Sequence, residues 1–212
     1  MLFLGDLDLI TILAILLALV VGITFHEFSH AYVADQLGDH RPRALGRVSL
    51  NPKDHIDPMG ALMFVLVGFG WGRPVPVNIG ALRPGRIGLA WVSAAGPIAN
   101  VSVAIVLAVI YRVLDMAGIN AVEVRHFLEV GVLFNLILAL FNLLPIPPLD
   151  GYNAALGVLP ARQAMTLQRY AQYGMMILLG LVLASYVLPG GGPLSWLFRA
   201  AQFIARVLLG GA

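Results

Sequence analysis

The sequence predicts an α-helical polytopic membrane protein with about four spanning helices. Hydrophobic residues make up 59% of the 212 residues and charged residues only 11%, whereas soluble domains carry about 25% charged residues. Long apolar runs recur along the chain, and no internal repeat, low-complexity tract or long polar linker divides it. We therefore expect a single membrane domain over residues 1–212, with its functional core at about residues 7–152.

Four apolar segments are long enough to cross a hydrocarbon core of about 30 Å as helices. We predict these spans at residues 7–36, 87–114, 129–149 and 170–188. The residues before the first apolar run include two acids and no basic residue. This segment is therefore expected to be a retained span and not a cleaved signal peptide.

Three shorter segments complete the predicted fold. The apolar run 59–69 reaches only about 16 Å as a helix, so we expect a re-entrant segment that enters the bilayer and returns. Residues 71–78 alternate Val with Pro or Arg between glycines, which predicts a small membrane-associated β hairpin or edge strand. Beyond the glycines of 190–192, residues 194–209 have the spacing of a C-terminal amphipathic helix.

The most specific motif is His26-Glu27-Phe28-Ser29-His30, at the end of the first apolar run. Positions i and i+4 share one helix face, so His26 and His30 are placed to bind one zinc ion. Glu27 points elsewhere and is free to act as a base on water at the metal. In the alternative, the three side chains pack against polar partners in a helical bundle. That alternative fits a membrane poorly, because ionisable groups within spans are rare and costly.

Two histidines leave a zinc ion short of a third protein ligand. The chain has no cysteine, so the site must be built from His and carboxylate. No HxxGxxH continuation and no glutamate at thermolysin-like spacing follows His30. Asp150, after the prolines of 145–148, is the one acid between Glu129 and the C-terminus. We predict Asp150 as the ligand; the alternative is a turn residue in a Pro–Gly segment.

Basic residues predict the orientation of the chain. Seven of the 13 Lys and Arg fall within residues 41–86, and two more are Arg162 and Arg169. The positive-inside rule places these segments in the cytoplasm and the N-terminus outside. If 59–69 is re-entrant, His30 and Asp150 reach the same membrane depth. The net charge of +2 and the scattered basic residues give no indication of nucleic-acid binding.

These motifs resemble those of the site-2 protease family of intramembrane zinc metalloproteases. Residues 26–30 match its HExxH signature, and residues 142–151 resemble its downstream NxxPxxPxDG-like motif. Residues 95–100 are similar to the GPxxN element of the family, and residues 46–52 and 71–78 resemble its short bacterial members. The likeness covers most of residues 20–152.

The resemblance implies one Zn²⁺ per chain, with His26, His30 and Asp150 as ligands and Glu27 catalytic. It further implies regulated intramembrane proteolysis, in which transmembrane helices of single-span membrane proteins are cleaved near the cytoplasmic face. The expected location is the bacterial or archaeal inner membrane, with multiple spans in the lipid bilayer. No PDZ module interrupts the chain, so the substrate filtering of larger relatives is not expected.

At positions that match the family, Asn100 and Asn142 are expected to donate hydrogen bonds to the developing oxyanion. The alternative for each is hydrogen bonding between helices of the bundle. In a less favoured hypothesis, His55, in the loop after the span that carries His26 and His30, approaches the metal in a closed state of the protein. His40 is expected to be merely solvated.

Two other classes of function remain open at this point. A zinc or cation transporter also places His and Asp within spans, but it does not need Glu27 beside the first histidine. A non-catalytic scaffold has no reason to keep that base. Replacement of Glu27 separates the three classes, because only a protease loses its activity while retaining zinc.

Overall fold

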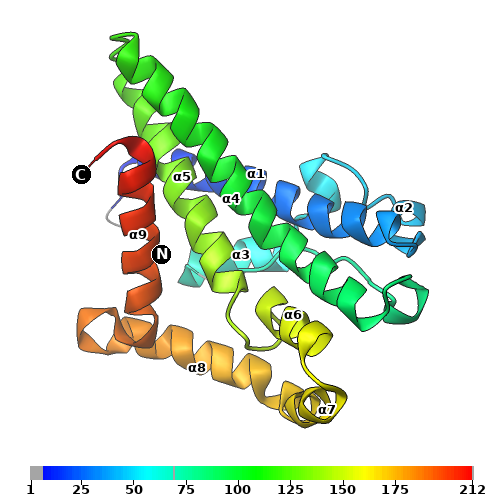
Figure 1. The fold of residues 1–212 in the computed structure, drawn as a ribbon. Helices are drawn as coiled ribbons and strands as arrows, with labels where there is room; N and C mark the ends of the chain where they lie inside the picture. Colours follow the sequence, from blue (N-terminus) through cyan, green and yellow to red (C-terminus); the bar gives the residue numbers. More distant parts are fainter. Residues whose placement is uncertain (1–6, 69, 212) are drawn as a thin grey trace.

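The computed structural model describes residues 7–68 and 70–211, and this part of the chain is built from helices (Figure 1). Four helical stretches are long and apolar enough to cross a membrane: α1 (Leu9–Gln36), α4 (Arg86–Met116), α5 (Val122–Asn142) and the stretch Ala161–Val187, which joins α7 (Ala161–Arg169) to α8 (Gly174–Val187). Within the described residues, these four candidate spans agree with the predicted multi-pass membrane protein.

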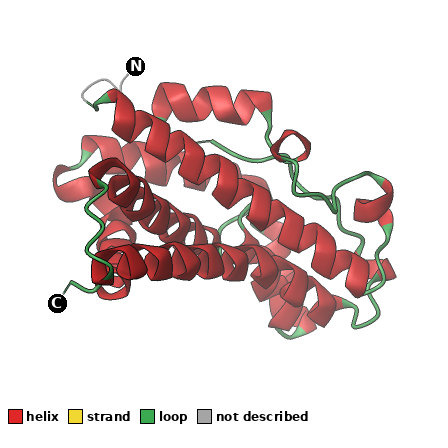
Figure 2. Cartoon of the chain, turned by 90° about the horizontal axis from the view of Figure 1, so that it is seen from above, coloured by secondary structure: helices red, strands yellow, loops and turns green. Residues whose placement is uncertain are grey.

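Shorter helices connect or cover these spans. They are α2 (Arg41–Ala44), α3 (Pro58–Val67), α6 (Asp150–Val158) and α9 (Ser195–Leu209), with 3₁₀ turns at Pro52–Asp54, Ile79–Ala81, Ala171–Tyr173 and Pro189–Leu194. Figure 2 shows helices and loops throughout, and no strand in the part of the chain that it describes.

Helix α1 begins at Asp8, whose carboxylate accepts a hydrogen bond from the Thr11 amide at 2.9 Å. This is the usual arrangement of an N-cap, which satisfies an otherwise unpaired amide of the first turn. A second bond, from the Thr11 hydroxyl, helps to lower the pKa of the Asp8 carboxyl below its ordinary value. The helix is 28 residues long and carries both histidines in its second half.

One core lies where α4 and α5 meet α9. Ala104 and Ala108 of α4 and Val132 of α5 are almost completely buried with Ala201 of α9. Small residues let membrane helices approach closely, where dispersion contacts replace the hydrophobic effect. The predicted C-terminal helix is therefore present and packs along α5 (Figure 1). Its exposed face carries large apolar side chains, including Phe203.

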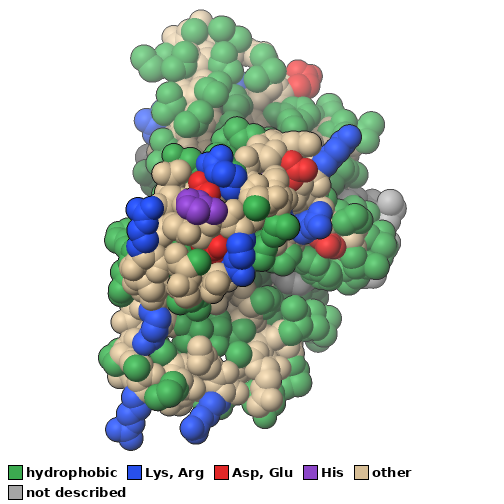
Figure 3. All heavy atoms as spheres, turned by 90° about the vertical axis from the view of Figure 1, so that its right-hand side faces the viewer, with side chains coloured by type: hydrophobic (Ala, Val, Ile, Leu, Met, Phe, Trp, Pro, Cys, Tyr) green, Lys and Arg blue, Asp and Glu red, His purple; other side chains and the backbone are tan. Residues whose placement is uncertain are grey.

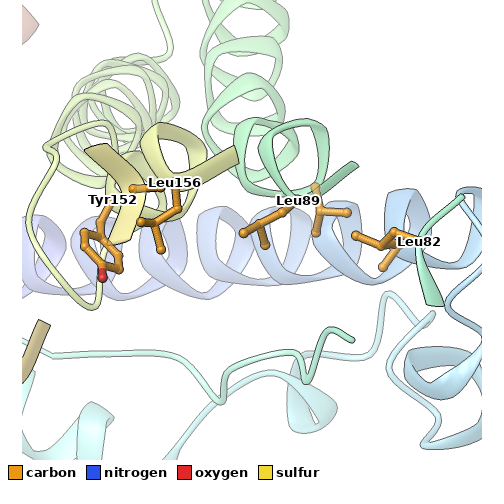
Figure 4. Packing of buried hydrophobic residues seen from close by; sticks show 7 residues of the cluster. Leu82, Leu89, Tyr152 and Leu156 are labelled. Carbon is orange, nitrogen blue, oxygen red and sulfur yellow. The ribbon is translucent and has the colours of Figure 1, made fainter. Parts of the chain in front are cut away.

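A second core joins α6 to the first half of α4 (Figure 4). Leu82 and Leu89 pack with Tyr152 and Leu156, and all four side chains are at least 92% buried. Arg86 adds hydrogen bonds to the carbonyl oxygens of the last turn of α6, including Leu159 O at 2.9 Å. These contacts fix α6, and therefore its first residue, against the rest of the bundle.

The third span differs from the prediction. Residues 129–149 were expected to be helical, but α5 begins at Val122 and ends at Asn142. Prolines at 145, 147 and 148 lack an amide hydrogen and clash with a preceding turn, so a helix cannot continue through them. Asp150 consequently opens α6 and does not end a spanning helix.

The predicted β hairpin at 71–78 is wrong within the described residues. The segment is extended, but its one bridge joins Gly72 to Ile56, with the Arg73 amide donating to His55 O at 2.7 Å. Two prolines at 74 and 76 cannot donate to a ladder, which prevents longer pairing. Arg47 holds the segment instead, through bonds to the carbonyl oxygens of residues 73 and 74.

Helix α3 is ten residues long and is not among the helices that could span a membrane. Its start is capped by Asp57, which accepts from the Gly60 amide at 2.8 Å, and it ends at Gly68 with a left-handed φ of 70°. The chain then passes back over its first turn, because Gly60 lies directly against the backbone of Trp71.

Charged side chains gather at one end of the molecule. Figure 3 shows Lys and Arg spread over the face that carries α2 and the neighbouring loops. Asp39, which is fully buried, accepts two hydrogen bonds from the Arg41 side chain and one from the Asn78 amide at 2.6 Å. The bonds from Arg41 lower the pKa of the Asp39 carboxyl. Asp39 thus anchors the far end of the extended segment to the loop after α1.

Candidate metal centre

Three side chains from α1 and α6 converge on one point inside the bundle. His26 Nε2 lies 3.0 Å from Asp150 Oδ2, and His30 Nε2 lies 3.2 Å from Asp150 Oδ1. The two Nε2 atoms are 3.0 Å apart. Four ligands about 2.0 Å from a tetrahedral zinc ion lie about 3.3 Å from one another. The structure therefore brings together the three predicted ligands at nearly the spacing that zinc requires.

The hydrogen bonds at the far side of each ring determine where the protons lie. His26 Nδ1 is 2.7 Å from Asn100 Oδ1, and His30 Nδ1 is 2.7 Å from Val92 O. Both partners are oxygen atoms that can only accept, so each Nδ1 carries a hydrogen and donates. With its hydrogen on Nδ1, each ring can present the Nε2 lone pair to a cation that lies between the two Nε2 atoms and the Asp150 carboxylate.

This arrangement fits a cation. Two lone pairs and a negative carboxylate repel one another at about 3 Å unless a positive charge lies among them. No described residue donates a hydrogen bond to Asp150 Oδ2, although this atom is buried. The donor set of two imidazoles and one carboxylate is that of catalytic zinc sites, which leave a fourth position for water or substrate.

Gly96 of α4 gives the two rings the space that they occupy. A Cβ atom at this position would lie 2.5 Å from His30 Nε2 and 2.6 Å from His26 Cε1, closer than any normal contact. The rings meet edge to face, with centroids 4.6 Å apart. Pro97 follows within the helix, where it removes one backbone hydrogen bond. The segment at 95–100 thus forms the wall behind both ligands.

Asn100 lies on the same wall, but its amide does not face the metal. The side chain is fully buried, and Nδ2 donates to Gly22 O at 3.0 Å and to Asn135 Oδ1 at 3.1 Å. Its oxygen accepts from His26. Asn100 therefore forms hydrogen bonds between helices, which was the alternative to its expected role at the oxyanion. It also orients the metal ligand His26.

Asn142 is half-buried at the end of α5, and its Nδ2 donates to Leu138 O of its own helix at 3.0 Å. Its expected contact with an oxyanion stays a prediction.

Asn135 is the buried polar residue that the sequence analysis missed. It lies on α5 with no exposed surface and donates from Nδ2 to Gly131 O at 2.9 Å. The available signal was a lone amide in the middle of an otherwise apolar run. Its hydrogen bond with Asn100 of α4 and its close approach to Gly22 of α1 could not be found from the sequence, because both depend on how three helices pack.

The Glu27 carboxylate is not part of the ligand cluster. A Cβ atom on Gly72 would lie 3.1 Å from Glu27 Oε1, so the carboxylate lies beside the extended segment. Arg47 is buried nearby, which lowers the pKa of its guanidinium, while the negative charge of Glu27 acts in the opposite direction. Glu27 therefore stands between the metal site and the backbone of residues 71–78.

The other histidines lie away from the ligand cluster. His55 is fully buried in its loop and donates from Nε2 to Ser49 O at 2.6 Å; the structure does not bring it to the metal ligands. His40 is largely exposed, as expected, and pairs with Asp35 at 2.9 Å. His126 contacts the Thr11 hydroxyl near the start of α1 at 2.9 Å.

The fold and the site define the class: a multi-pass membrane protein with a metallopeptidase centre on its first spanning helix. The model of peptidase family M50 matches residues 112–185, which include the proline loop and Asp150. "Putative zinc metalloprotease YwhC" of Bacillus subtilis (strain 168) is 37% identical over 182 residues, covering 82% of this chain and 83% of that protein.

A second relative, "Putative zinc metalloprotease Rip2" of Mycobacterium tuberculosis (strain ATCC 25618 / H37Rv), is 35% identical over 205 residues, with 91% of this chain and 75% of that protein covered. No solved structure matches the chain. The chain belongs to peptidase family M50, the site-2 protease family, and it is a zinc metalloprotease.

Asp150→Ala is expected to lower the zinc content of the purified protein from about one ion per chain to a small fraction of that, because two imidazoles alone hold zinc weakly. Plasma mass spectrometry of wild type and variant side by side measures this. Asp115→Ala, which removes an exposed carboxylate of a surface ion pair, is the matched control and should retain zinc. Equal zinc in all three proteins would exclude Asp150 as a ligand.

Gly96→Ala is expected to reduce zinc content strongly, since the added methyl group must displace both imidazole rings. Alanine favours a helix over glycine by about 1 kcal/mol, so a loss of zinc could not come from weaker helix formation. Gly180→Ala on α8, where nothing lies within 4 Å of the added atom, is the matched control. Full zinc occupancy in Gly96→Ala would contradict the contact between Gly96 and the rings.

Proposed function

We propose that this zinc metalloprotease hydrolyses peptide bonds within transmembrane segments of single-span membrane proteins. The observation that carries the proposal is the place of the ligand cluster: His26 and His30 lie on a helix long enough to span a membrane, and they converge with the partly buried Asp150 carboxylate of α6 among apolar helices. A protease acting on soluble chains has no need to bury its metal among such helices.

The residues of the site divide the chemistry among them. Zinc, when bound by His26, His30 and Asp150, acts as a Lewis acid that makes water reactive at neutral pH. Glu27 takes the proton from the attacking water and later gives it to the leaving amine. Asn100 holds the His26 ring in position, and Asn142 is the proposed side-chain donor to the oxyanion.

The proposed orientation follows from the charged end of the molecule. Basic residues gather around α2 and the following loops (Figure 3), and the positive-inside rule assigns this end to the cytoplasm of a bacterial or archaeal cell. The N-terminus of α1 then lies outside. Helix α3 and the returning segment are proposed to enter the bilayer and return on the cytoplasmic side. Cleavage accordingly occurs near the cytoplasmic face.

An apolar groove offers a route for the substrate. Its volume is about 390 Å³, and residues of α1, α3, α5, α8 and α9 line it. Ile23 and Trp71 lie in this lining, and Ile23 also lies within 3.0 Å of the Cβ position of Gly72. The groove therefore reaches the part of the extended segment that adjoins Glu27.

A helical substrate has no free peptide groups, so the bond to be cut must first leave its helix. We propose that the unwound stretch lies beside residues 71–78 and pairs with their backbone, as peptides do when they add a strand to an edge. Arg47 holds this segment at residues 73 and 74, and Asp39 holds it at Asn78. Its prolines limit pairing with other chains.

Glu27→Gln is expected to abolish cleavage of a single-span reporter in proteoliposomes, by about 10²- to 10⁴-fold, because the amide cannot accept the proton of water. Zinc content should stay at the wild-type level, since Glu27 is not part of the ligand cluster. Rates are measured from product bands and zinc by mass spectrometry. Cleavage at the wild-type rate by Glu27→Gln, or cleavage by the wild type restricted to soluble loops of the reporter, would refute the proposed function.

Val75→Pro is expected to slow cleavage of the same reporter at least tenfold, by removing a backbone amide from the extended segment. Val75→Ala removes both methyl groups of the side chain but keeps the backbone amide, and this variant should cleave at close to the wild-type rate. Zinc content of both variants serves as the check on folding. Equal rates for the two variants would exclude backbone pairing at this position.

A further inference from the structure

We propose that Asn135 is a positioning residue of the metal site. Acting through Asn100, it fixes the state of the His26 ring in which Nε2 keeps the lone pair that binds zinc. The inference deepens the proposed function and rests on its zinc-binding part alone. It concerns three helices, because His26 lies on α1, Asn100 on α4 and Asn135 on α5.

The three side chains form a continuous chain of hydrogen bonds. Asn135 Oδ1 accepts from Asn100 Nδ2 at 3.1 Å, and Asn100 Oδ1 accepts from His26 Nδ1 at 2.7 Å. Both asparagines have no exposed surface, and His26 is 8% exposed. Burying polar groups of this kind costs free energy unless every donor and acceptor is paired. Each of the three side chains therefore needs the hydrogen-bond partners that it has here.

Two backbone carbonyl groups set the direction of this chain. A carbonyl oxygen can only accept, so Gly131 O requires that Asn135 turn its Nδ2 toward it, at 2.9 Å. Oδ1 of Asn135 must then face Asn100. Gly22 O likewise takes a hydrogen from Asn100 Nδ2 at 3.0 Å. The oxygen of Asn100 is left facing His26, and His26 Nδ1 must carry the hydrogen.

The opposite orientation of the Asn100 amide would prevent His26 from binding zinc through Nε2. With Asn100 turned over, its oxygen would face two acceptors, Gly22 O and Asn135 Oδ1, while its amide nitrogen would face His26 Nδ1. The ring would then place its hydrogen on Nε2, where the lone pair for zinc belongs. Asn135 supplies one of the two acceptors that exclude this state.

The backbone of α1 leaves room for both amides. A Cβ atom on Gly22 would lie 3.0 Å from Asn135 Oδ1 and 3.4 Å from Asn100 Nδ2. Gly22 is one helical turn before His26, so the amides lie directly behind the ligand on the same helix. If the bond between Asn100 and Asn135 only joined α4 to α5, the two amides would not need to lie against the backbone of α1.

The test is a double-mutant cycle on zinc affinity, with Asn135→Leu, Asn100→Leu and both together. Changes behind a metal ligand typically cost 10- to 100-fold in affinity, and we expect about tenfold from Asn135→Leu. In the Asn100→Leu background the same change should cost nothing further, because its route to His26 is gone. Zinc dissociation constants are measured by chelator competition on the full chain in detergent.

Thr24→Val is the matched control. Thr24 is buried on α1 and donates to Val20 O of its own helix, so its loss removes a buried hydroxyl without touching the chain of amides. Its zinc affinity should be unchanged. A tenfold cost of Asn135→Leu in both backgrounds, or none in either, would overturn the inference. A wild type that binds no zinc would overturn the proposed function with it.

A second measurement covers the case in which the Asn100→Leu protein fails to fold. Nitrogen-15 spectra of ring-labelled histidine in metal-free protein distinguish the two neutral ring states. Wild-type His26 should carry its hydrogen on Nδ1, and Asn135→Leu should show a mixture of both states. An unchanged spectrum in Asn135→Leu would exclude the positioning role.

Discussion

The rest of the structure is arranged around three side chains with electron pairs to donate, His26, His30 and Asp150, whose donor atoms lie about 3 Å apart and repel one another. Two imidazole nitrogens and a carboxylate point at one position, and lone pairs placed so close to one another repel unless a cation lies among them. The chain keeps it in place by pairing the far nitrogen of each ring with an oxygen of α4, Asn100 Oδ1 for His26 and Val92 O for His30. Binding of zinc therefore stabilises the packing of α1, α4 and α6 together, because each of them holds or orients a ligand.

The position of Asp150 follows from where the third spanning helix stops. Prolines after Asn142 end α5, and the loop turns the chain so that a new helix, α6, begins at the aspartate. Leu156 and Tyr152 then pack on Leu89 of α4 (Figure 4). Gly157 allows this close approach, since a Cβ atom there would lie 2.7 Å from that of Ala90. A carboxylate on a short, firmly packed helix is held more precisely than one at the frayed end of a long span.

The features that the sequence predicted correctly are those with local causes. Helical spacing alone puts His26 and His30 on one face. Asp150 was named as the third ligand because it is the one acid between Glu129 and the C-terminus, and the structure brings it beside the two histidines; its binding of zinc stays a prediction. The hairpin at 71–78 was predicted from alternation, but Pro74 and Pro76 withhold the amides that a ladder needs. The end of the third span was placed too late because apolar character outweighed the prolines. Gly96, the Val92 carbonyl and Asn135 could not have been found, since each acts through contacts between segments distant in sequence.

Gly72 connects the metal site to the proposed recognition of substrate. Any side chain at this position would meet Glu27, Ile23 and the backbone of His55 within about 3.3 Å, so the extended segment approaches Glu27 with bare backbone. In the proposed mechanism, a substrate that lies along that segment is recognised through the substrate's own peptide groups and not through a pocket for one side chain. In the proposed function, the apolar groove, which is lined mainly by aliphatic and aromatic residues, selects substrates for hydrophobic character in the same general way. In the proposed mechanism, selectivity then depends on which transmembrane helix unwinds beside Glu27, because weak helix formers such as Gly and Pro lower the cost of exposing a peptide bond.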